Sequence, residues 1–411
     1  MKNISAIKKI LVTGATGFVG SQLTVSLENH NVDLLLAGRN EAKIKQVFPK
    51  YSVISYDNLD SYSEKIDVVV HLAVLNNNAK NKQAEFQNAN VDLFKKILSF
   101  CKKNNVSKVI NLSSFHIYGD KLDPYSTTKR EAYRLAKEDH STHITNIICP
   151  FIYSTPFQGK ISLLNKLPAL IRQPSFTVVS ALKPVIHRDV VISEIINQLS
   201  NHNADEDILL ADNKDSNIVY FIFKKIINYG LSISALSILI IPMVLIWLLI
   251  KMSSKGPGIF TQNRIGLKGK QFKLYKFRTM KVGTKNMGTH FASSSDITKL
   301  GSFLRRTKLD ELPQLLNILL GDMELIGPRP GLPEQQDLTD FRSKKNIYDV
   351  VPGVTGYAQV NQVDMSAPKI LAEWDNRYIK MRSIIFDMSI IIQTFLGKGG
   401  GDKVKKIVST K

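Results

Sequence analysis

Residues 8–20 read KKILVTGATGFVG, and this stretch decides the fold of the first part of the chain. The apolar run Ile10–Val12 is typical of a buried strand. Gly14, Gly17 and Gly20 follow it at the spacing of a turn that opens a helix. Bare backbone at such a turn, together with the positive end of the helix, can receive a pyrophosphate. The stretch therefore predicts a dinucleotide site, although by itself it also fits a tight strand-to-helix turn.

Further apolar runs follow up to about Ser200 and alternate with amphipathic stretches. This alternation predicts an α/β fold with a Rossmann-type, doubly wound parallel sheet over residues 1–200. The expected strands lie in the runs KKILVTG, DLLLAG, DVVVHLA, KVINLSS and NIICPF.

The length and composition of the chain limit the number of domains and the classes of partner that we expect. The 411 residues exceed one ordinary core and indicate two domains. With 55 Lys and Arg against 35 Asp and Glu, the net charge of +20 favours anionic partners: nucleic acid, phospholipid or nucleotide-sugars. The basic residues are spread out and show no aromatic-interleaved motif, which argues against nucleic acid. Cys101 and Cys149 have no metal-binding spacing, so we expect a reducing compartment.

The remainder of the chain divides by composition. The polar stretch 201–217 predicts a linker, residues 218–397 a second domain, and the glycine-rich basic stretch 398–411 a disordered tail. Residues 231–250 read LSISALSILIIPMVLIWLLI, which is long enough to cross a bilayer as a helix. A buried core helix is the alternative, and the absence of a polar stripe disfavours it.

The charges that flank this apolar segment do not orient it. Lys224 and Lys225 precede it, Lys251 and Lys255 follow it, and Pro242 lies in its middle. Both domains are expected to use cytosolic substrates. We therefore predict a helix broken at Pro242 that re-enters the cytoplasmic face of the membrane, because proline deletes a backbone donor and disfavours straight continuation.

The first domain carries more than the glycine turn. It contains Asp57 after a strand, HLA at 71–73, Asn90, LSS followed by Tyr118-Gly119, and Tyr125-x-x-x-Lys129. With these motifs it resembles the extended short-chain dehydrogenase/reductase family of nucleotide-sugar epimerases, dehydratases and reductases. The resemblance implies that Tyr125 is the acid/base, that Lys129 lowers its pKa and holds the ribose, and that Ser114 bonds the reacting sugar oxygen. A phenol with an ordinary pKa of about 10 needs such a nearby cation for this chemistry.

Two departures qualify this resemblance. Gly38-Arg39-Asn40 stands where many relatives place an acid, and a basic residue there suits a 2′-phosphate, so we expect NADP(H) in preference to NAD. The region is also short, so its substrate lobe is reduced. An alternative therefore stays open: the first domain binds nucleotide for regulation or docking and is catalytically inactive.

The second domain carries a longer series of motifs. They are FTQNRIG at 260–266, FKLYKFRTM at 272–280, LGSFLRRTKLDELPQLLNIL at 300–319, GDMELIGPRP at 321–330 and PGVTGYAQVN at 352–361. In this order they resemble the monotopic bacterial phosphoglycosyl transferases, or bacterial sugar transferases. We therefore expect a re-entrant membrane helix that leads into a small α+β domain. The resemblance implies that Asp310 is the nucleophile of a phosphosugar-aspartyl intermediate that releases UMP, and that Glu311 helps to bind Mg²⁺.

Physical reasoning fits these roles. A carboxylate can attack phosphorus and leave again, and a divalent ion offsets the pyrophosphate charge. Pro313 suits the first turn of a helix that starts near Asp310. The expected ligands of the substrate phosphates are Arg264, Lys276, Arg278 and Arg329; Lys276 and Arg278 share a strand face, and flanking prolines restrict Arg329.

Three positions depart from the transferase pattern. Asn228 replaces a frequent Asp, Ile241 replaces a frequent Ser before Pro242, and Gln362-Val363 replaces a common Gly-Arg. The first two concern the anchoring of the helix, and the third leaves the identity of the sugar open.

The sequence thus predicts a bifunctional enzyme at the cytoplasmic face of a bacterial inner membrane. Its first domain reduces or epimerises a UDP-sugar at C4, and its second transfers the sugar-1-phosphate to undecaprenyl phosphate for a surface glycan such as O-antigen or capsule. The expected partners are the UDP-sugar, undecaprenyl phosphate and membrane phospholipid, with no nucleic acid; a homo-oligomer is compatible with the sequence.

Overall fold

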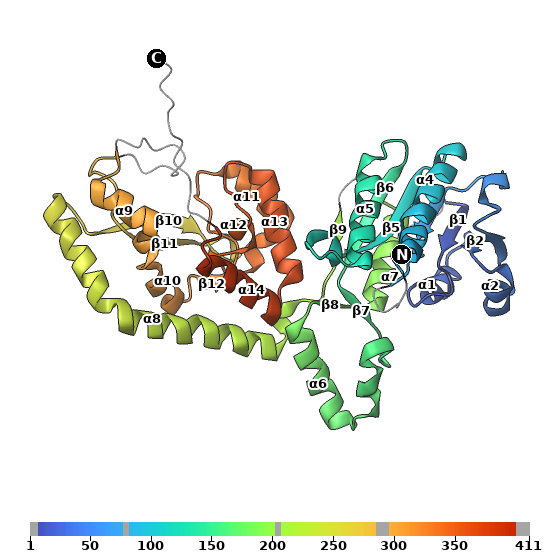
Figure 1. The fold of residues 1–411 in the computed structure, drawn as a ribbon, viewed down its shortest axis with the longest axis horizontal. Helices are drawn as coiled ribbons and strands as arrows, with labels where there is room; N and C mark the ends of the chain where they lie inside the picture. Colours follow the sequence, from blue (N-terminus) through green and yellow to red (C-terminus); the bar gives the residue numbers. More distant parts are fainter. Residues whose placement is uncertain (1–6, 77–81, 202–206, 285–295, 400–411) are drawn as a thin grey trace, which may run out of the picture. The chain divides into compact units, whose positions relative to one another are not determined.

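The computed structural model of the chain describes residues 7–76, 82–201, 207–284 and 296–399 (Figure 1). It contains two compact units. The first comprises Met1–Arg172 and Pro184–Asp212, and the second comprises Gln173–Lys183 and Asn213–Lys411. The boundary therefore lies at residue 212, later than the predicted end of the first domain at residue 200.

A parallel sheet forms the centre of the first unit. It has 7 strands in the order β3-β2-β1-β4-β5-β6-β9, and each neighbouring pair is parallel. This order confirms the predicted Rossmann-type, doubly wound sheet. The strands are β1 Lys9–Thr13, β2 Asp33–Gly38, β3 Ser52–Ser55, β4 Val68–His71, β5 Lys108–Ser114, β6 His143–Cys149 and β9 Ile208–Leu209; β7 Phe151–Tyr153 and β8 Val185–His187 pair separately.

Helices cover both faces of this sheet, so its strands are apolar on both sides. Along β1, Ile10 and Val12 enter one core, whereas Leu11 enters the other. This alternation follows from the period of two in a strand and explains the continuous apolar run in the sequence. The helices of the unit are α1 Gly20–Leu27, α2 Glu41–Val47, α3 Gln83–Gln87, α4 Leu93–Lys103, α5 Pro124–Glu138 and α7 Arg188–Leu199; α6, Ala169–Leu182, begins in this unit and ends in the second.

The predicted linker 201–217 is largely structured where it is described. Its short apolar run forms β9, which pairs with β6 at the edge of the sheet. Farther along, Lys214 Nζ donates to the carbonyls of Ser180 and Lys183, and Asp215 accepts two hydrogen bonds from Arg382 at 2.8 and 2.9 Å. The prediction of a simple linker is therefore wrong. Of the predicted tail, residues 400–411 lie outside the described residues.

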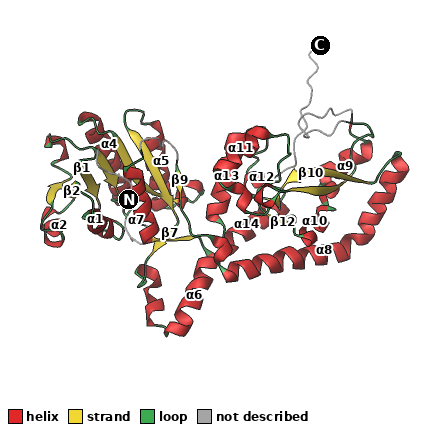
Figure 2. Ribbon diagram, turned by 180° about the vertical axis from the view of Figure 1, so that it is seen from behind, coloured by secondary structure: helices red, strands yellow, loops and turns green. Residues whose placement is uncertain are grey.

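The second unit is mainly helical and contains short strands (Figure 2). The antiparallel pair β10–β11 and the parallel pair β12–β13 confirm the expected small α+β domain. Its elements are α8 Ile218–Ser253, β10 Ile259–Ile265, β11 Gln271–Phe277, α9 Lys299–Thr307, α10 Gln314–Leu320, β12 Glu324–Ile326, α11 Gln336–Lys344, β13 Gly353–Thr355, α12 Tyr357–Val360, α13 Pro368–Met381 and α14 Ile384–Phe395.

The apolar segment lies within helix α8, the one described helix long and apolar enough to cross a membrane. One side of α8 packs Met243 and Ile250 against Phe277 of the hairpin. The opposite side is open, and Ile238 and Ile241 are 75% and 70% exposed. Only 11% of the most apolar stretch is buried, so α8 is not a core helix of the described part of the chain.

Pro242 does not break this helix. Helix α8 runs for 36 residues through Pro242, and Figure 1 shows that it bends along its length without interruption. A proline removes one backbone donor and displaces one carbonyl, and a bend accommodates both while the turns on either side keep their hydrogen bonds. The prediction of a broken helix is therefore wrong, and re-entry into the membrane stays a prediction.

Asn228 anchors α8 to the rest of the second unit. Its side chain is buried, and Oδ1 accepts a hydrogen bond from the Leu325 amide at 2.9 Å. An aspartate would accept the same bond, so the departure at residue 228 preserves the anchor. Lys224 adds an ion pair to Glu324 of the same strand, β12.

A buried ion pair joins α11 to α13. The Arg342 guanidinium donates to Asp375 Oδ2 through Nε at 3.0 Å and Nη2 at 2.7 Å, and both side chains are 2% exposed. Removing one member leaves an uncompensated buried charge.

We expect Asp375→Ala to destabilise the second unit by about 3–5 kcal/mol, because the Arg342 charge would stay buried without its partner. The matched variant is Asp349→Ala, which breaks the exposed pair with Lys268 (side chains 58% and 63% exposed) and should change stability by less than about 1 kcal/mol. Thermal unfolding of the full chain in detergent measures both variants. Equal shifts would contradict the assigned importance of the buried pair.

Candidate active sites

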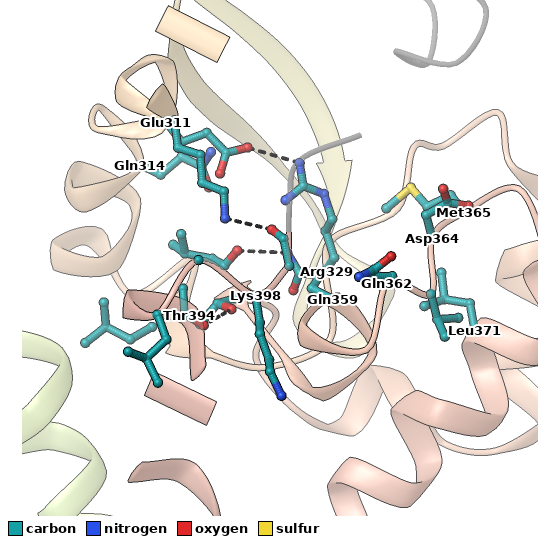
Figure 3. Close-up of a pocket in the computed structure, with 18 of the residues that line it drawn as sticks. Glu311, Gln314, Arg329, Gln359, Gln362, Asp364, Met365, Leu371, Thr394 and Lys398 are labelled. Atoms are coloured by element: carbon teal, nitrogen blue, oxygen red, sulfur yellow. Dashed lines mark hydrogen bonds and ion pairs between the residues drawn. The ribbon is translucent and has the colours of Figure 1, made fainter. Parts of the chain in front are cut away.

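The second unit contains a cavity of about 640 Å³ (Figure 3). Segments far apart in the sequence form its walls: the region between α9 and α10, the loop after β12, the segment from β13 to Met365, and the end of α14. Its polar lining residues are Lys308, Glu311, Gln314, Arg329, Thr355, Gln359, Gln362, Asp364, Thr394 and Lys398.

The Asp310-Glu311 pair lies between two helices. Lys308 ends α9 with a left-handed backbone (φ 58°), and Leu309–Glu311 then form one 3₁₀ turn. Pro313 caps the following helix, α10, where its missing N–H leaves no intrahelical bond unmade. The helix expected to start near Asp310 therefore begins only at Gln314, and a separate 3₁₀ turn carries both carboxylates.

Glu311 is held by two cations. Its Oε1 accepts hydrogen bonds from Lys276 Nζ at 2.7 Å and Arg329 Nη2 at 3.0 Å. Burial alone would raise the pKa of Glu311, but the charges of Lys276 and Arg329 outweigh it and hold that pKa far below the usual range. Glu311 therefore stays ionised, and it orders two of the four predicted phosphate ligands in one place.

Asp310 has a different environment. Its side chain is 8% exposed, and no hydrogen bond reaches its carboxylate from the described residues. Burial raises the pKa of Asp310 to about 6, with a smaller increase from the Glu311 charge and an opposing effect from Lys276. The adjacent carboxylates thus differ: Glu311 is fixed by cations, whereas Asp310 is unpaired and available for reaction.

Two buried arginines hold the backbone at Arg329 in place. Its carbonyl accepts a hydrogen bond from Arg342 Nη1 at 2.9 Å, and the neighbouring Pro330 carbonyl accepts one from Arg264 Nη1 at 3.1 Å. Sequence reasoning missed Arg342 because its place in α11 gives no motif.

Two predicted phosphate ligands lie elsewhere. Strand β11 ends at Phe277, so Arg278 does not continue the face that carries Lys276. Its guanidinium instead donates to the Ser254 and Lys255 carbonyls at 2.9 and 3.0 Å, beyond the end of α8. Arg264 is buried and supports Pro330 without lining the cavity. The structure therefore places these two arginines outside the cavity lining, and their binding of phosphate stays a prediction.

The side chains around Glu311 can be tested as ligands for the expected Mg²⁺. The described residues contain no group of three or more His, Cys, Asp or Glu side chains arranged for a metal. Both hydrogen bonds of Glu311 with described residues reach Oε1, which leaves Oε2 without a donor from that part of the chain. Mg²⁺ commonly takes one or two carboxylates and completes its shell with water and substrate phosphates, and these residues fit that mode.

In the first unit, the predicted cofactor residues gather at the carboxyl edge of the sheet. Gly14 has a φ of +69°, and a Cβ on Gly20 would lie 2.2 Å from the Gly14 carbonyl oxygen. The turn between β1 and α1 therefore requires both glycines. Arg39 follows β2 and Asp57 follows β3, and both side chains are exposed. In a doubly wound sheet this edge binds the ligand, beside the point where the strand order reverses.

The predicted catalytic residues lie at the same edge. Ser114 ends β5, and its Oγ lies 2.7 Å from His116 Nδ1, whose ring packs edge-on against Tyr125 at 5.1 Å between centroids. Burial raises the pKa of Tyr125, and a hydrogen bond with Ser114 opposes this. Sequence reasoning missed His116, although it stands two residues after Ser114.

Lys129 does not act on Tyr125 as expected. Its Nζ donates to the Leu112 carbonyl at 3.2 Å, and burial lowers the pKa of Lys129 to about 8. The pKa of Tyr125 is raised, and Lys129 is not among the groups that shift it. The expectation that Lys129 lowers the Tyr125 pKa is therefore not met in this structure.

Comparison with known families matches both units. Residues 219–398 match the model of the bacterial sugar transferase family, and residues 10–175 match that of the NAD dependent epimerase/dehydratase family. The first match lies almost entirely within the Rossmann-type unit, and the second covers the part of the other unit that starts with α8.

Individual relatives match the second unit. UDP-glucose:undecaprenyl-phosphate glucose-1-phosphate transferase of Escherichia coli is 40% identical over 175 residues, which are 39% of this chain and 37% of that protein. A putative undecaprenyl-phosphate N-acetylgalactosaminyl 1-phosphate transferase of Bacillus subtilis is 44% identical over 28% of this chain and 65% of its own length. The uncharacterized sugar transferase EpsL of Bacillus subtilis is 37% identical over 35% of this chain and 71% of its own length.

The chain spans 37%, 36% and 32% of the first three curated relatives, so the match concerns the transferase domain. Among solved structures, UDP-glucuronic acid 4-epimerase from Bacillus cereus aligns with 49% of this chain and 78% of its own, at 21% identity and a TM-score of 0.41. The assignment of the first unit rests on the family model and on its own strand order. The chain therefore belongs to the bacterial sugar transferase family, and its residues 10–175 match the model of the NAD dependent epimerase/dehydratase family.

Proposed function

We propose that the second unit transfers a sugar-1-phosphate from a UDP-sugar to undecaprenyl phosphate through a covalent intermediate on Asp310. The observation that carries this proposal is the contrast between the adjacent carboxylates: Asp310 is buried and accepts no hydrogen bond from the described residues, while Glu311 is held by Lys276 and Arg329. Glu311 lines a cavity of about 640 Å³, which offers room for a nucleotide-sugar, and Asp310 is its neighbour in the chain.

The reaction proceeds in two displacements at one phosphorus atom. Ionised Asp310 attacks the sugar-bearing phosphorus of the UDP-sugar, a bond from its carboxylate to phosphorus forms, and the bond to the bridging oxygen breaks so that UMP leaves. A phosphate oxygen of the polyprenyl phosphate then attacks the same phosphorus and releases the Asp310 carboxylate. The product is a polyprenyl diphosphate sugar.

The neighbouring residues neutralise charge during both steps. Lys276 and Arg329 lie at the pair and face the phosphate oxygens that gain charge as the leaving group departs. Glu311 keeps both cations in place through Oε1. Mg²⁺ bound with the pyrophosphate at Glu311 would add charge neutralisation to the leaving phosphate.

Helix α8 is the proposed membrane anchor. Its outward side exposes a continuous apolar surface, and Leu320 at the end of α10 is 66% exposed as well. Such surfaces are typical of membrane contact. With both flanks of the apolar segment basic, we place the protein monotopically at the cytoplasmic face of the bacterial inner membrane, where UDP-sugars and anionic phospholipid headgroups occur.

The first unit is proposed to finish the sugar before transfer, by reduction or epimerisation at C4. Tyr125 would exchange the hydroxyl proton and Ser114 would bond the sugar oxygen. The glycine turn at 14–20 would hold the pyrophosphate of NADP(H), whose nicotinamide supplies or accepts the hydride, and Arg39 would face the 2′-phosphate. In the alternative, the same fold binds the nucleotide without turnover, which suits the reduced substrate lobe.

Asp310→Asn should abolish formation of lipid-linked sugar, because the amide cannot form the intermediate, while any nicotinamide reaction of the first unit continues. Transfer of radiolabelled sugar phosphate from a UDP-sugar to undecaprenyl phosphate measures the effect. Asp349→Asn, an exposed position, is the control and should retain full activity. Persistent transfer by the Asp310 variant would refute the role of this residue.

Transfer should fall as the pH is lowered through about 6, because protonation of Asp310 removes the nucleophile and its folded pKa lies near that value. Lys276→Met should move this acidic limb to higher pH, since the Lys276 charge lowers the Asp310 pKa. The measurement is kcat/KM for transfer between pH 5 and 8, with Lys268→Met at an exposed position as the control. If the acidic limb of the pH profile lies at the same pH in Lys276→Met as in the wild type, its assignment to Asp310 is contradicted.

Tyr125→Phe should lower nicotinamide-dependent conversion of the UDP-sugar by about 10²–10⁴-fold and leave transfer of a finished sugar unchanged. Absorbance of NADPH or NADH with 4-keto UDP-sugars gives the measurement. Tyr51→Phe is the control, because Tyr51 precedes β3 at the opposite edge of the sheet. A wild-type chain that binds NADPH and transfers sugar phosphate, yet converts none of these sugars, would favour the inactive alternative.

A further inference from the structure

Two glutamines in the transferase cavity have polar atoms that the described chain does not pair. Gln314 Nε2 and Gln359 Oε1 are both shielded from solvent, and neither has a hydrogen-bond partner among the described residues. Both residues line the cavity. One atom is a donor and the other an acceptor, so the cavity wall offers one of each to a ligand.

Gln314 lies beside the reactive pair. It is the first residue of α10, its side chain is 2% exposed, and Figure 3 shows it next to Glu311. No described group accepts a hydrogen bond from its Nε2. A neutral donor at this place can approach an anionic phosphate oxygen without competing for the Glu311 carboxylate, which Lys276 and Arg329 already occupy.

Gln359 lies in α12 and lines the same cavity as Arg329 and Gln362 (Figure 3). Its Nε2 donates to the Val354 carbonyl at 3.0 Å, and this bond fixes which end of the amide is the acceptor. A Cβ on Gly356 would lie 3.2 Å from Oε1, so the glycine leaves room around that oxygen. Gln359 Oε1 is therefore a hydrogen-bond acceptor in a fixed position on the cavity wall, and a ligand with an N–H or O–H group could donate to it.

Unpaired buried polar atoms lower the stability of a fold, and native structures contain few of them. Two such atoms, Gln314 Nε2 and Gln359 Oε1, line one cavity, and Glu311 with its two cations lies beside them. This arrangement indicates that a ligand completes the hydrogen bonds of both atoms. Apolar residues also line this cavity, including Leu325, Val354, Met365 and Leu371. Among apolar neighbours, an unpaired polar atom strongly favours a ligand that forms a hydrogen bond with it over a ligand that cannot.

We propose that Gln314 and Gln359 are substrate-binding residues for the nucleotide-sugar, an inference that rests on the function proposed above. Gln314 Nε2 donates to an oxygen of the transferred phosphate. Gln359 Oε1 accepts from a donor on the neutral part of the substrate and so determines specificity. That donor belongs either to the sugar, as a hydroxyl or acylamino N–H, or to the N3–H of the uracil ring.

The test uses Gln314→Met and Gln359→Met in the full chain, because methionine has nearly the same length and no donor or acceptor of comparable strength. Gln336→Met, at an exposed position of α11, is the matched control. Steady-state transfer is measured with UDP-N-acetylhexosamines and UDP-hexoses, together with inhibition by UMP and with thermal unfolding.

For Gln314→Met we expect kcat/KM to fall about 10–100-fold, mostly in kcat, with a melting temperature equal to or above that of the wild type. This pattern separates substrate binding from a structural role, because a structural role would lower the melting temperature. Unchanged transfer, or a loss that only follows unfolding, would overturn the proposal for Gln314.

For Gln359→Met we expect a similar loss in kcat/KM, and the other readouts identify the donor. A changed ratio of kcat/KM between UDP-sugars with unchanged UMP inhibition assigns the donor to the sugar, whereas weaker UMP inhibition with an unchanged ratio assigns it to uracil. If neither changes while the wild type is active, Gln359 is not a substrate contact. If the wild type itself fails to transfer, the proposed function fails instead.

Discussion

The ionic contact of Glu311 with Lys276 and Arg329 is the interaction on which the transferase site depends. Three separate segments supply these residues: strand β11, the turn before α10 and the loop after β12. Glu311 balances two cations that would otherwise repel each other, and among the described residues the adjacent Asp310 carboxylate accepts no hydrogen bond. This ion cluster therefore places two positive charges where a phosphate could bind. It also gives the two neighbouring carboxylates different environments.

Other buried groups maintain that cluster. Arg342 joins Asp375 of α13 to the Arg329 carbonyl, so the position of the guanidinium is tied to the packing of two helices. Arg278 holds the end of α8 near the hairpin that carries Lys276. Helix α8 and the Glu311 ion cluster thus contact the same hairpin, β10–β11.

Much of the fold was predictable from local patterns. The glycine turn after β1 and the repeated apolar runs predicted the parallel sheet, because strands covered on both faces are apolar throughout. The edge strand β9 was missed, since a two-residue pairing in a polar stretch gives almost no periodic signal. The path of α8 through Pro242 was also missed, because the sequence shows where a donor is lost and cannot show whether a bend absorbs that loss.

By itself, the sequence determined the order of motifs through which the chain resembles two families. That resemblance implied roles for Asp310 and Glu311 and for Ser114, Tyr125 and Lys129, and these roles stay predictions. Only the tertiary structure decided which cations meet Glu311. Lys276 and Arg278 are nearly adjacent in sequence, yet the strand ends between them and turns the second toward the end of α8. Local spacing fixes chemistry within a turn or a strand, whereas contacts between distant segments depend on packing that no local pattern records.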